Sequence, residues 1–390
     1  MKVRLLTLAV LIAATLALWP GAAQARRSVP RGFIGMNADG PLLSPPVNLG
    51  AQLGTMVGAG VESIRAAFYW AVAQPFPNFD AVPVDQRSLY ENVAGVPTNF
   101  AATDRIVRAA AARRLSVLPT ILWAPSWDAL GAVQFAAPPA DPAPYAAYVA
   151  ALAARYGPRG SFWAANPALP KLPIRDWQIW NEPSFTQFWD AQPFAAHYVE
   201  LLRASRSALR QVDSGARVIL AGFPGKSWIA LRQVYAAGGR GLFDVVAVHP
   251  FTLFVGGVLK ILQLDRGVMS RHGDGRLPLM VTETGWPSAA GKIRKGFTFG
   301  YEVSRRGQAA RARQALVAFA RHRRQLRIER VYWYTWLTRD RDRTYPFDWA
   351  GLETISGRRI GKKPALAAFR STALRLEGCR RKTGVATSCR

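Results

Sequence analysis

Short runs of β-branched and aromatic residues alternate with stretches of helical spacing, and this alternation is the feature that most constrains the fold. Eight candidate strands occur along the chain: Phe33–Asn37, Val61–Phe68, Ser116–Trp123, Asp176–Trp180, Arg217–Ala221, Val245–His249, Leu279–Thr282 and Val331–Trp336. Strands that alternate with helices form parallel βαβ units, and eight such units close a barrel. The predicted fold class is therefore α/β, a (β/α)8 TIM barrel with a short C-terminal tail.

A doubly wound open sheet would show the same alternation of strands and helices. That fold favours a phosphate turn with the spacing G-x-G-x-x-G after its first strand, and the segment GFIGMNADG (32–40) lacks this spacing. Two long stretches, 144–157 and 194–212, repeat apolar residues at helical spacing and supply amphipathic helices for the outside of a barrel. We therefore favour the barrel over the open sheet.

The N-terminal residues have the pattern of a secretory signal peptide. A basic head, MKVR, precedes the apolar run LLTLAVLIAATLALW, and Ala23-Gln24-Ala25 fits a cleavage site between small residues. An uncleaved anchor is the alternative, but the run is shorter than the roughly 20 residues that a spanning helix needs. We expect a signal peptide at 1–25, a barrel domain at 26–375 and secretion to the extracellular space or periplasm, with no membrane span after cleavage.

The two cysteines of the chain, Cys379 and Cys389, lie in the C-terminal tail, 376–390. Export to an oxidising compartment would let them form a disulfide. Such a bridge would constrain the tail and leave the barrel unaffected.

The formal net charge of +27 raises the question of a polyanionic partner. The densest basic run, 311–330, interleaves arginines with Leu316, Phe319 and Leu326 at the spacing of a helix with one buried face. No nucleic-acid-binding motif accompanies the charge. We expect no nucleic-acid partner, and weak adhesion to an anionic cell-envelope polymer is the remaining interpretation of the basic surface.

Polar and aromatic residues stand at the predicted C-terminal ends of the strands, where a (β/α)8 barrel places its active site. They are Asn37, Arg65, Trp123, Asn181, Glu182, His249, Glu283 and Trp336. The two carboxylates follow the fourth and seventh strands, which face each other across the mouth of a closed barrel. Because no cluster of His or Cys ligands accompanies them in the sequence, convergent carboxylates favour cleavage of a glycosidic bond over metal chemistry. We therefore expect no metal and no cofactor.

Two motifs carry a resemblance to a known group of enzymes. WQIWNEPS (177–184) resembles the Asn-Glu-Pro motif at the fourth strand of clan A glycoside hydrolases, and VTETGWPS (281–288) resembles the nucleophile strand of that clan. VESIRAAFYW (61–70) and WYTWLTRD (333–340) extend the resemblance over most of the chain. Within the clan the chain is most similar to the bacterial group around families 39 and 5, while its GWPS ending is also similar to family 17.

The resemblance implies a retaining, metal-independent glycosidase that cleaves O-glycosidic bonds of an oligo- or polysaccharide. It makes Glu182 the general acid/base and Glu283 the nucleophile. Asn181 would bind the sugar 2-hydroxyl, Arg65 would hold Glu283 ionised, and His249 and Asn37 would complete the binding site. Phe251 departs from the clan, because many members carry a tyrosine there that contacts the nucleophile. Either Tyr334, Thr252 or another group replaces it, or the activity is modest.

Tryptophans near the strand ends are candidate platforms for sugar rings. Trp336 is the first candidate, followed by Trp286 and Trp123, although a large aromatic side chain is more often part of a core. The missing tyrosine and the basic surface support an alternative function from another class: a non-catalytic barrel that binds polysaccharide or an anionic envelope polymer. The carboxylate pair argues against that alternative, because a binder has no use for it.

Overall fold

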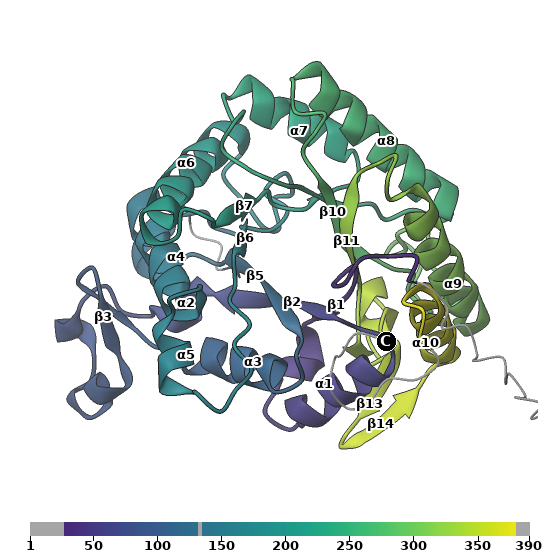
Figure 1. The fold of residues 1–390 in the computed structure, drawn as a ribbon, viewed down its shortest axis with the longest axis horizontal. Coiled ribbons are helices and arrows are strands. Elements are labelled where there is room, and N and C mark those ends of the chain that lie inside the picture. The colour runs from purple at the N-terminus through teal and green to yellow at the C-terminus, as the bar shows by residue number, and fades with distance from the viewer. Residues whose placement is uncertain (1–26, 132–134, 380–390) are drawn as a thin grey trace, which may run out of the picture.

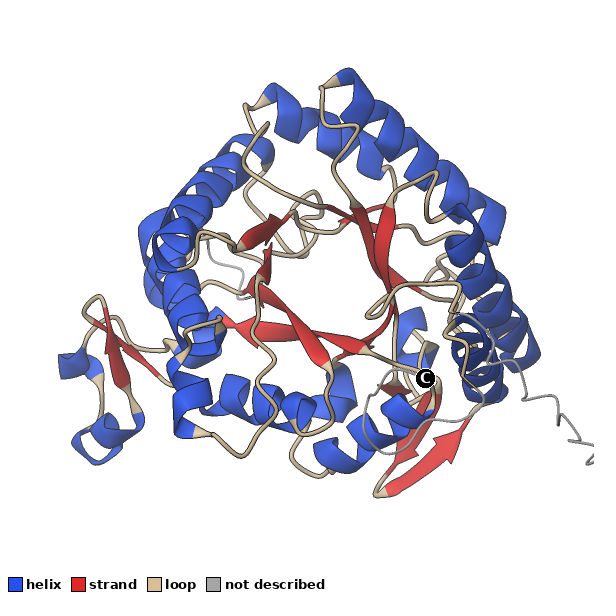
Figure 2. Cartoon of the chain, viewed as in Figure 1, coloured by secondary structure: helices blue, strands red, loops and turns tan. Residues whose placement is uncertain are grey.

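The structure of the protein is a computed structural model, which describes residues 27–131 and 135–379. A ring of helices surrounds a sheet of parallel strands (Figure 1, Figure 2). The strand segments of this sheet are β1 Ile34–Ala38, β2 Ser63–Tyr69, β5 Ser116–Leu122, β6 Asp176–Ile179, β7 Arg217–Ile219, β8 Phe223–Pro224, β9 Val246–His249, β10 Leu279–Thr284 and β11 Ile328–Trp333. The predicted (β/α)8 barrel is confirmed, and the ends of the predicted strands differ from these by at most three residues.

The order of the segments, β7-β6-β5-β2-β1-β11-β10-β9-β8, shows how the sheet closes. β7 pairs with β6, whereas β8 pairs with β9, and both belong to one stretch of chain, 217–224. A parallel bridge between Ile219 and Val245 completes the closure. The nine segments therefore make eight barrel strands, with the fifth strand divided in two.

Eight helices form the outer ring: α1 Leu49–Gly58, α3 Ala101–Ala111, α4 Pro142–Tyr156, α6 Ala195–Val212, α7 Ser227–Ala236, α8 Val255–Arg271, α9 Arg305–His322 and α10 Pro364–Leu376. Both predicted amphipathic helices, α4 and α6, bury the expected apolar faces. α4 starts where the Asp141 side chain accepts a hydrogen bond from the Ala143 N–H and Pro142 occupies the first turn. The prediction of a helix through the basic run 311–330 is wrong for the last part of that run. α9 ends at His322, and β11 begins at Ile328, whose side chain is buried.

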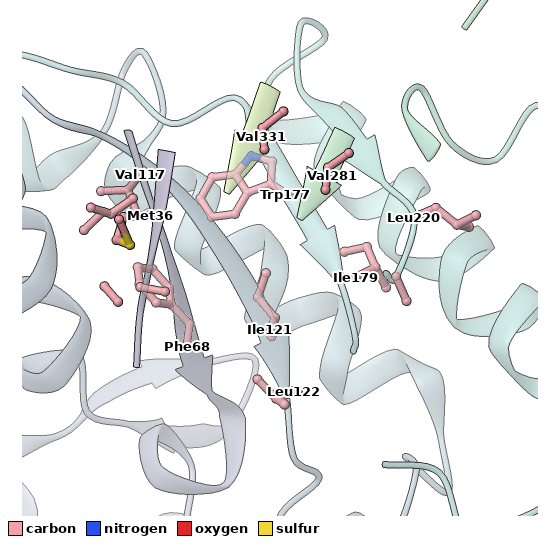
Figure 3. Close-up of a cluster of buried hydrophobic side chains, with 14 of the residues drawn as sticks. Met36, Phe68, Val117, Ile121, Leu122, Trp177, Ile179, Leu220, Val281 and Val331 are labelled. Atoms are coloured by element: carbon pink, nitrogen blue, oxygen red, sulfur yellow. The ribbon is translucent and has the colours of Figure 1, made fainter. Parts of the chain in front are cut away.

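Two apolar clusters lie on opposite faces of the strands, because neighbouring side chains of a strand point in opposite directions. The larger cluster packs the sheet against the helices and contains Val117, Ile121 and Trp177 (Figure 3). The smaller one fills the barrel with Leu118, Ile219, Val245, Ala247, Met280 and Tyr332. The packed interior leaves the C-terminal ends of the strands as the place for a site.

Shorter elements decorate the ring. They are α2 Trp70–Ala73, α5 Ser161–Ala165, the hairpin β3 Glu91–Val93 with β4 Val96–Thr98, the small sheet of β12 Leu337–Thr338, β13 Glu353–Ser356 and β14 Arg359–Lys362, and the 3-10 turns η1 Gly40–Leu43, η2 Phe79–Ala81, η3 Val84–Leu89, η4 Ser126–Asp128 and η5 Pro346–Trp349. The predicted signal peptide and Cys389 lie outside the described residues, so both the cleavage at Ala25 and the disulfide stay predictions. Among the described helices, none is long and apolar enough to cross a bilayer.

Candidate active site

The two predicted glutamates meet at the C-terminal end of the barrel. Glu182 follows β6, and Glu283 is the fifth residue of β10. One carboxylate oxygen of each residue lies within 4.8 Å of the other. The Glu182 and Glu283 side chains are only 10% and 12% exposed. The sequence prediction that they converge on one small space is confirmed.

The backbone departs from regular strand geometry at both glutamates. The pairing of β10 with β11 shifts register between Val281 and Thr284, so Glu283 lies in a bulge, a device that redirects a side chain near active sites. Glu182 has a φ of 44°, in the left-handed region, and its carbonyl accepts a hydrogen bond from the Phe185 N–H across a tight turn. Because non-glycine residues rarely adopt this region, the turn holds Glu182 in an orientation that an extended strand would not give.

Arg65 organises the polar groups beneath the glutamates. Its Nη1 donates to Glu283 Oε1 at 2.7 Å and to Asn37 Oδ1 at 2.9 Å, while Nη2 donates to Asn181 Oδ1 at 2.6 Å. Nε donates to Gln178 Oε1 at 2.6 Å. The guanidinium therefore fixes the amides of Asn37 and Asn181 as well as the nucleophile candidate.

This network corrects the predicted role of Asn37. Its Nδ2 donates to the Thr282 carbonyl at 2.9 Å and to the Trp333 carbonyl at 3.4 Å, and its Oδ1 accepts from Arg65, so both the nitrogen and the oxygen of the buried amide are engaged within the protein. Gln178 was not predicted as a site residue. A polar side chain inside the apolar run WQIW was the available signal, since a buried amide needs a hydrogen-bonding partner.

His249, the last residue of β9, lies between the two carboxylates. Its Nδ1 is 2.5 Å from Glu182 Oε1, and its Nε2 is 3.8 Å from Glu283 Oε1. Burial and the positive charge of Arg65 lower the pKa of His249 well below its ordinary value, so the imidazole is neutral. A neutral ring can accept a hydrogen bond at Nδ1 from protonated Glu182 or, as the other tautomer, donate from Nδ1 to the ionised carboxylate, and it therefore orients Glu182 in both states.

Desolvation dominates the electrostatics of the glutamates. Burial and the negative charge of Glu283 raise the pKa of Glu182 well above its ordinary range. Burial also raises the pKa of Glu283 to about 7, although the charge of Arg65 opposes the rise. The expected influence of Arg65 on Glu283 is present, but it is smaller than the effect of burial. Glu182 is the carboxyl more inclined to keep its proton, as a general acid requires.

Gly222, between β7 and β8, allows His249 to occupy this position. A Cβ added at Gly222 would lie 1.9 Å from His249 Nε2 and 2.3 Å from its Cδ2, distances at which the ring must move. The contact joins two segments far apart in sequence, so no local signal marks this glycine.

We predict that Gly222→Ala lowers kcat by about 10²-fold, because a displacement of about 1 Å near the reacting groups has that order of effect. The added methyl would push His249 and weaken its bond to Glu182. Gly58→Ala is the matched control, since nothing lies within 4 Å of a Cβ at that position. Steady-state kinetics with thermal melting checks the prediction, and unchanged kcat in Gly222→Ala would contradict it.

Two of the predicted sugar platforms are wrong. Trp336 is 0% exposed, and its indole N–H donates to Gln52 Oε1 on α1 at 2.8 Å, so the ring faces a helix instead of the mouth. Trp286 is also 0% exposed and donates to the Leu253 carbonyl. Trp123 is half-buried and stacks on Tyr69 with 3.9 Å between ring centroids. Trp123 therefore remains a candidate, and the other two belong to the core.

An aromatic wall stands beside the glutamates instead. It consists of Phe251, Phe299, Tyr301, Tyr334, Tyr345 and Phe347, joined by ring contacts of 4.9 to 6.2 Å. Burial raises the pKa values of the Tyr301, Tyr334 and Tyr345 hydroxyls, and the negative charge of Glu283 adds to the rise. Of these three residues, only Tyr334 was predicted from the sequence as a group for the site.

Phe251 belongs to this wall and brings no hydroxyl to the site. Of the groups considered as replacements, Thr252 bonds the Phe254 carbonyl at 2.7 Å and is engaged in its own loop. Tyr334 directly follows β11, and its N–H donates to the Thr284 carbonyl, one residue from Glu283. Tyr334 is therefore the better candidate to replace the missing tyrosine.

Glu182, His249 and Glu283 are also residue types that ligate metals, and one atom from each lies within 4.8 Å of the others. Arg65 already donates to Glu283 Oε1, and a cation there would meet its positive charge at close range. Glu182 is also already hydrogen-bonded to His249. The contacts of this trio fit an acid/base and nucleophile pair better than a metal site.

Comparison with known proteins gives no match to any family model and none to a curated sequence. Solved structures do match. A family 39 glycoside hydrolase from Bacteroides cellulosilyticus WH2 aligns with a TM-score of 0.60 and 15% identity, over 88% of this chain and 63% of that chain. A monomeric beta-xylosidase from Caulobacter crescentus CB15 aligns with a TM-score of 0.61 and 18% identity, over 89% and 69%.

A glucosidase from Croceicoccus marinus aligns with a TM-score of 0.63 and 16% identity, over 90% of this chain and 70% of that chain. The chain has the barrel fold of clan A glycoside hydrolases. The structural neighbours include family 39, in agreement with the resemblance drawn from WQIWNEPS and VTETGWPS. At these identities the likeness shows the (β/α)8 barrel fold, and the activity depends on the chemistry of the site.

Proposed function

We propose that this protein is a secreted, retaining glycoside hydrolase that cleaves O-glycosidic bonds of an oligo- or polysaccharide with two glutamates. The observation that carries the proposal is the approach of two buried carboxylates to within 4.8 Å at the mouth of a barrel. Retaining enzymes hold their carboxyl groups about 5–5.5 Å apart, whereas inverting enzymes need about 6.5–9.5 Å to admit a water. The clan A fold supports the same reading.

In the first step, ionised Glu283 attacks the anomeric carbon while Glu182 donates its proton to the glycosidic oxygen. A bond forms between the carbon and a Glu283 oxygen, and the bond to the leaving group breaks. Asn181 Oδ1 accepts a hydrogen bond from Arg65, and the amide N–H group of Asn181 donates to the sugar 2-hydroxyl. Hydrogen bonds to the 2-hydroxyl strengthen in the transition state of glycoside cleavage.

In the second step, Glu182, now ionised, removes a proton from water, and the oxygen of that water attacks the anomeric carbon. The ester to Glu283 breaks, and the sugar leaves with its original configuration. His249 orients the Glu182 carboxyl through both steps by its 2.5 Å contact. When the ester breaks, Glu283 is again a carboxylate, and the hydrogen bond from Arg65 stabilises its negative charge.

We predict that an activated 2-deoxy-2-fluoro glycoside labels Glu283. The fluorine slows both steps, and a good leaving group lets the ester form faster than it hydrolyses, so the glycosyl-enzyme accumulates. A panel of xylosyl, glucosyl and arabinofuranosyl reagents, followed by peptide mass spectrometry, would locate the ester. Labelling should persist in the presence of EDTA, because no step uses a metal.

Glu283→Ala protein is the control and should stay unlabelled. Absence of labelling by every reagent would contradict the proposal and favour the polysaccharide-binding alternative. Labelling of a different carboxylate would overturn the assignment of the nucleophile, and loss of labelling in EDTA would overturn metal independence.

The proposed secretion is supported by the sequence of residues 1–25, a basic head, an apolar run and a small-residue cleavage site. We expect the mature protein to begin at Arg26. N-terminal sequencing of protein recovered from the producing cells would check this, and a retained Met1 would contradict it.

A further inference from the structure

Large apolar side chains are exposed on two loops that flank the aromatic wall. Leu253 and Phe254 lie on the loop between β9 and α8, and Phe297 and Phe299 lie on the loop between β10 and α9. We call these four residues the apolar rim. Phe254 is 60% exposed and Phe297 is 45% exposed. Exposed apolar residues that gather on one region mark an interaction site, whereas single ones need no explanation.

Contacts bring Leu253, Phe254 and Phe299 to one region, and Phe297 precedes Phe299 by two residues on the same loop. Arg311 of α9 donates to the Leu253 carbonyl and lies over the Phe254 ring at 5.0 Å. Phe299 contacts Tyr301 at 5.7 Å, and Tyr301 stacks on Phe251, two residues before Leu253. Helices α8 and α9, which follow the two loops, are neighbours in the ring (Figure 1).

Cations without acidic partners border the rim. Arg294, Lys295, Arg311 and Arg343 form no ion pair with any described residue. We call these four residues the basic border. The Arg294 N–H donates to the Arg343 carbonyl and Arg343 Nε donates to the Lys292 carbonyl, which ties the loop to the segment after β12.

The nearby acids do not neutralise the border. Glu302 accepts hydrogen bonds from the backbone N–H groups of Phe299 and Gly300, and Asp342 accepts from the backbone and hydroxyl of Thr344. The Asp348 carboxylate, in the segment that carries Arg343, likewise accepts from the backbone N–H groups of Arg341 and Asp342. These acids are engaged by backbone groups, so the positive charge of the basic border is left for an anionic partner to compensate.

The residue types of the apolar rim favour a lipid partner over a sugar. Sugar platforms combine a ring with a polar edge, as in Trp and Tyr, but the rim consists of phenylalanines and a leucine. Among the exposed large hydrophobic residues of the described chain, Tyr345 of the aromatic wall is the only one with such an edge. Phenylalanine and leucine beside lysine and arginine are the combination that inserts into the headgroup region of anionic bilayers.

We propose that the apolar rim and basic border dock the barrel mouth on an anionic lipid surface. On the proposed function, this surface would present the catalytic glutamates to glycans held at a membrane, such as the headgroup of a glycolipid. Phe299 belongs to both the rim and the aromatic wall, where it contacts Phe347, so docking would bring the lipid-bound sugar directly to the site.

Sedimentation with vesicles of equal parts phosphatidylglycerol and phosphatidylcholine tests the proposal. The wild type should bind these vesicles and bind phosphatidylcholine alone about tenfold more weakly. A double variant, Phe254→Ser with Phe297→Ser, and a second, Arg294→Gln with Lys295→Gln, should each weaken binding about tenfold. The controls are Leu89→Ser, exposed on η3 at the far side of the ring, and Arg232→Gln, exposed on α7.

Binding that falls with the charge variant but survives the apolar variant would mean simple adhesion and would overturn the proposal. Equal losses in the control variants, or binding to soluble polygalacturonate but to neither vesicle, would overturn it as well. Activity of the same variants on a soluble chromogenic glycoside should equal that of the wild type. Vesicle binding needs no hydrolysis, so failure of the docking proposal and failure of the glycosidase proposal can be told apart.

Discussion

Replacing Glu283 with alanine is expected to reduce hydrolysis by roughly 10⁴-fold or more, the order seen when an enzyme loses its nucleophile. The variant retains Glu182 and His249 but has no oxygen to form the glycosyl ester. Arg65 keeps its bonds to Asn37, Asn181 and Gln178, so the binding site should survive the change. Rates of hydrolysis of a glycoside with a good leaving group measure the loss.

External azide should restore turnover of that glycoside in Glu283→Ala. The removed side chain leaves a space at the face of the sugar that Glu283 would attack, and azide can enter it and bond to the anomeric carbon. The product would be a glycosyl azide with configuration opposite to that of the substrate, which NMR can assign. Glu200→Ala, on the exposed side of α6, is the matched control and should keep full activity.

An active Glu283→Ala variant in the absence of azide would show that Glu283 is not the nucleophile. A glycosyl azide that retains the substrate configuration would also contradict the assignment, because it would require a second nucleophile. Since azide can react only with a glycoside held in a folded site, rescue also excludes misfolding as the cause of the loss.

Much of the barrel could be predicted because each strand is a short apolar run followed by a helical stretch. The runs 116–123 and 279–282 differ from the observed strands by one or two residues at one end. The division of the fifth strand could not be predicted, since it depends on which neighbour each half contacts: β7 contacts β6 and β8 contacts β9.

The glutamates could be predicted because each stands at a fixed place beside a strand in a recognisable motif. The sugar platforms could not, because the chain turns after β11 and the order of residues no longer indicates which side chain faces the mouth. Tyr334 lies at the site, while Trp336, two residues later, points at α1. Gly222 and the apolar rim depend on contacts between distant segments, which single-sequence patterns do not record.

Replacing Glu182 with glutamine is expected to slow hydrolysis of glycosides with poor leaving groups by about 10²–10⁴-fold, the contribution of general acid catalysis. The amide has nearly the shape of the acid and can still donate to His249 Nδ1, but it cannot release a proton to the leaving oxygen. A dinitrophenyl glycoside needs no proton, so formation of the ester from it should be nearly normal. The second step lacks its base, and the ester should accumulate.

The pH dependence distinguishes this role from a structural one. Glu283 must be ionised, and burial raises its pKa to about 7, so kcat/KM of the wild type should rise with pH through that region. Glu182 must be protonated, and burial and the Glu283 charge raise its pKa well above the usual value, so kcat/KM should fall at still higher pH. Glu182→Gln should lose the fall at high pH and keep the rise near 7, because only the acid has been removed. Equal losses on good and poor leaving groups, or a fall at high pH that persists in the variant, would show that another group donates the proton.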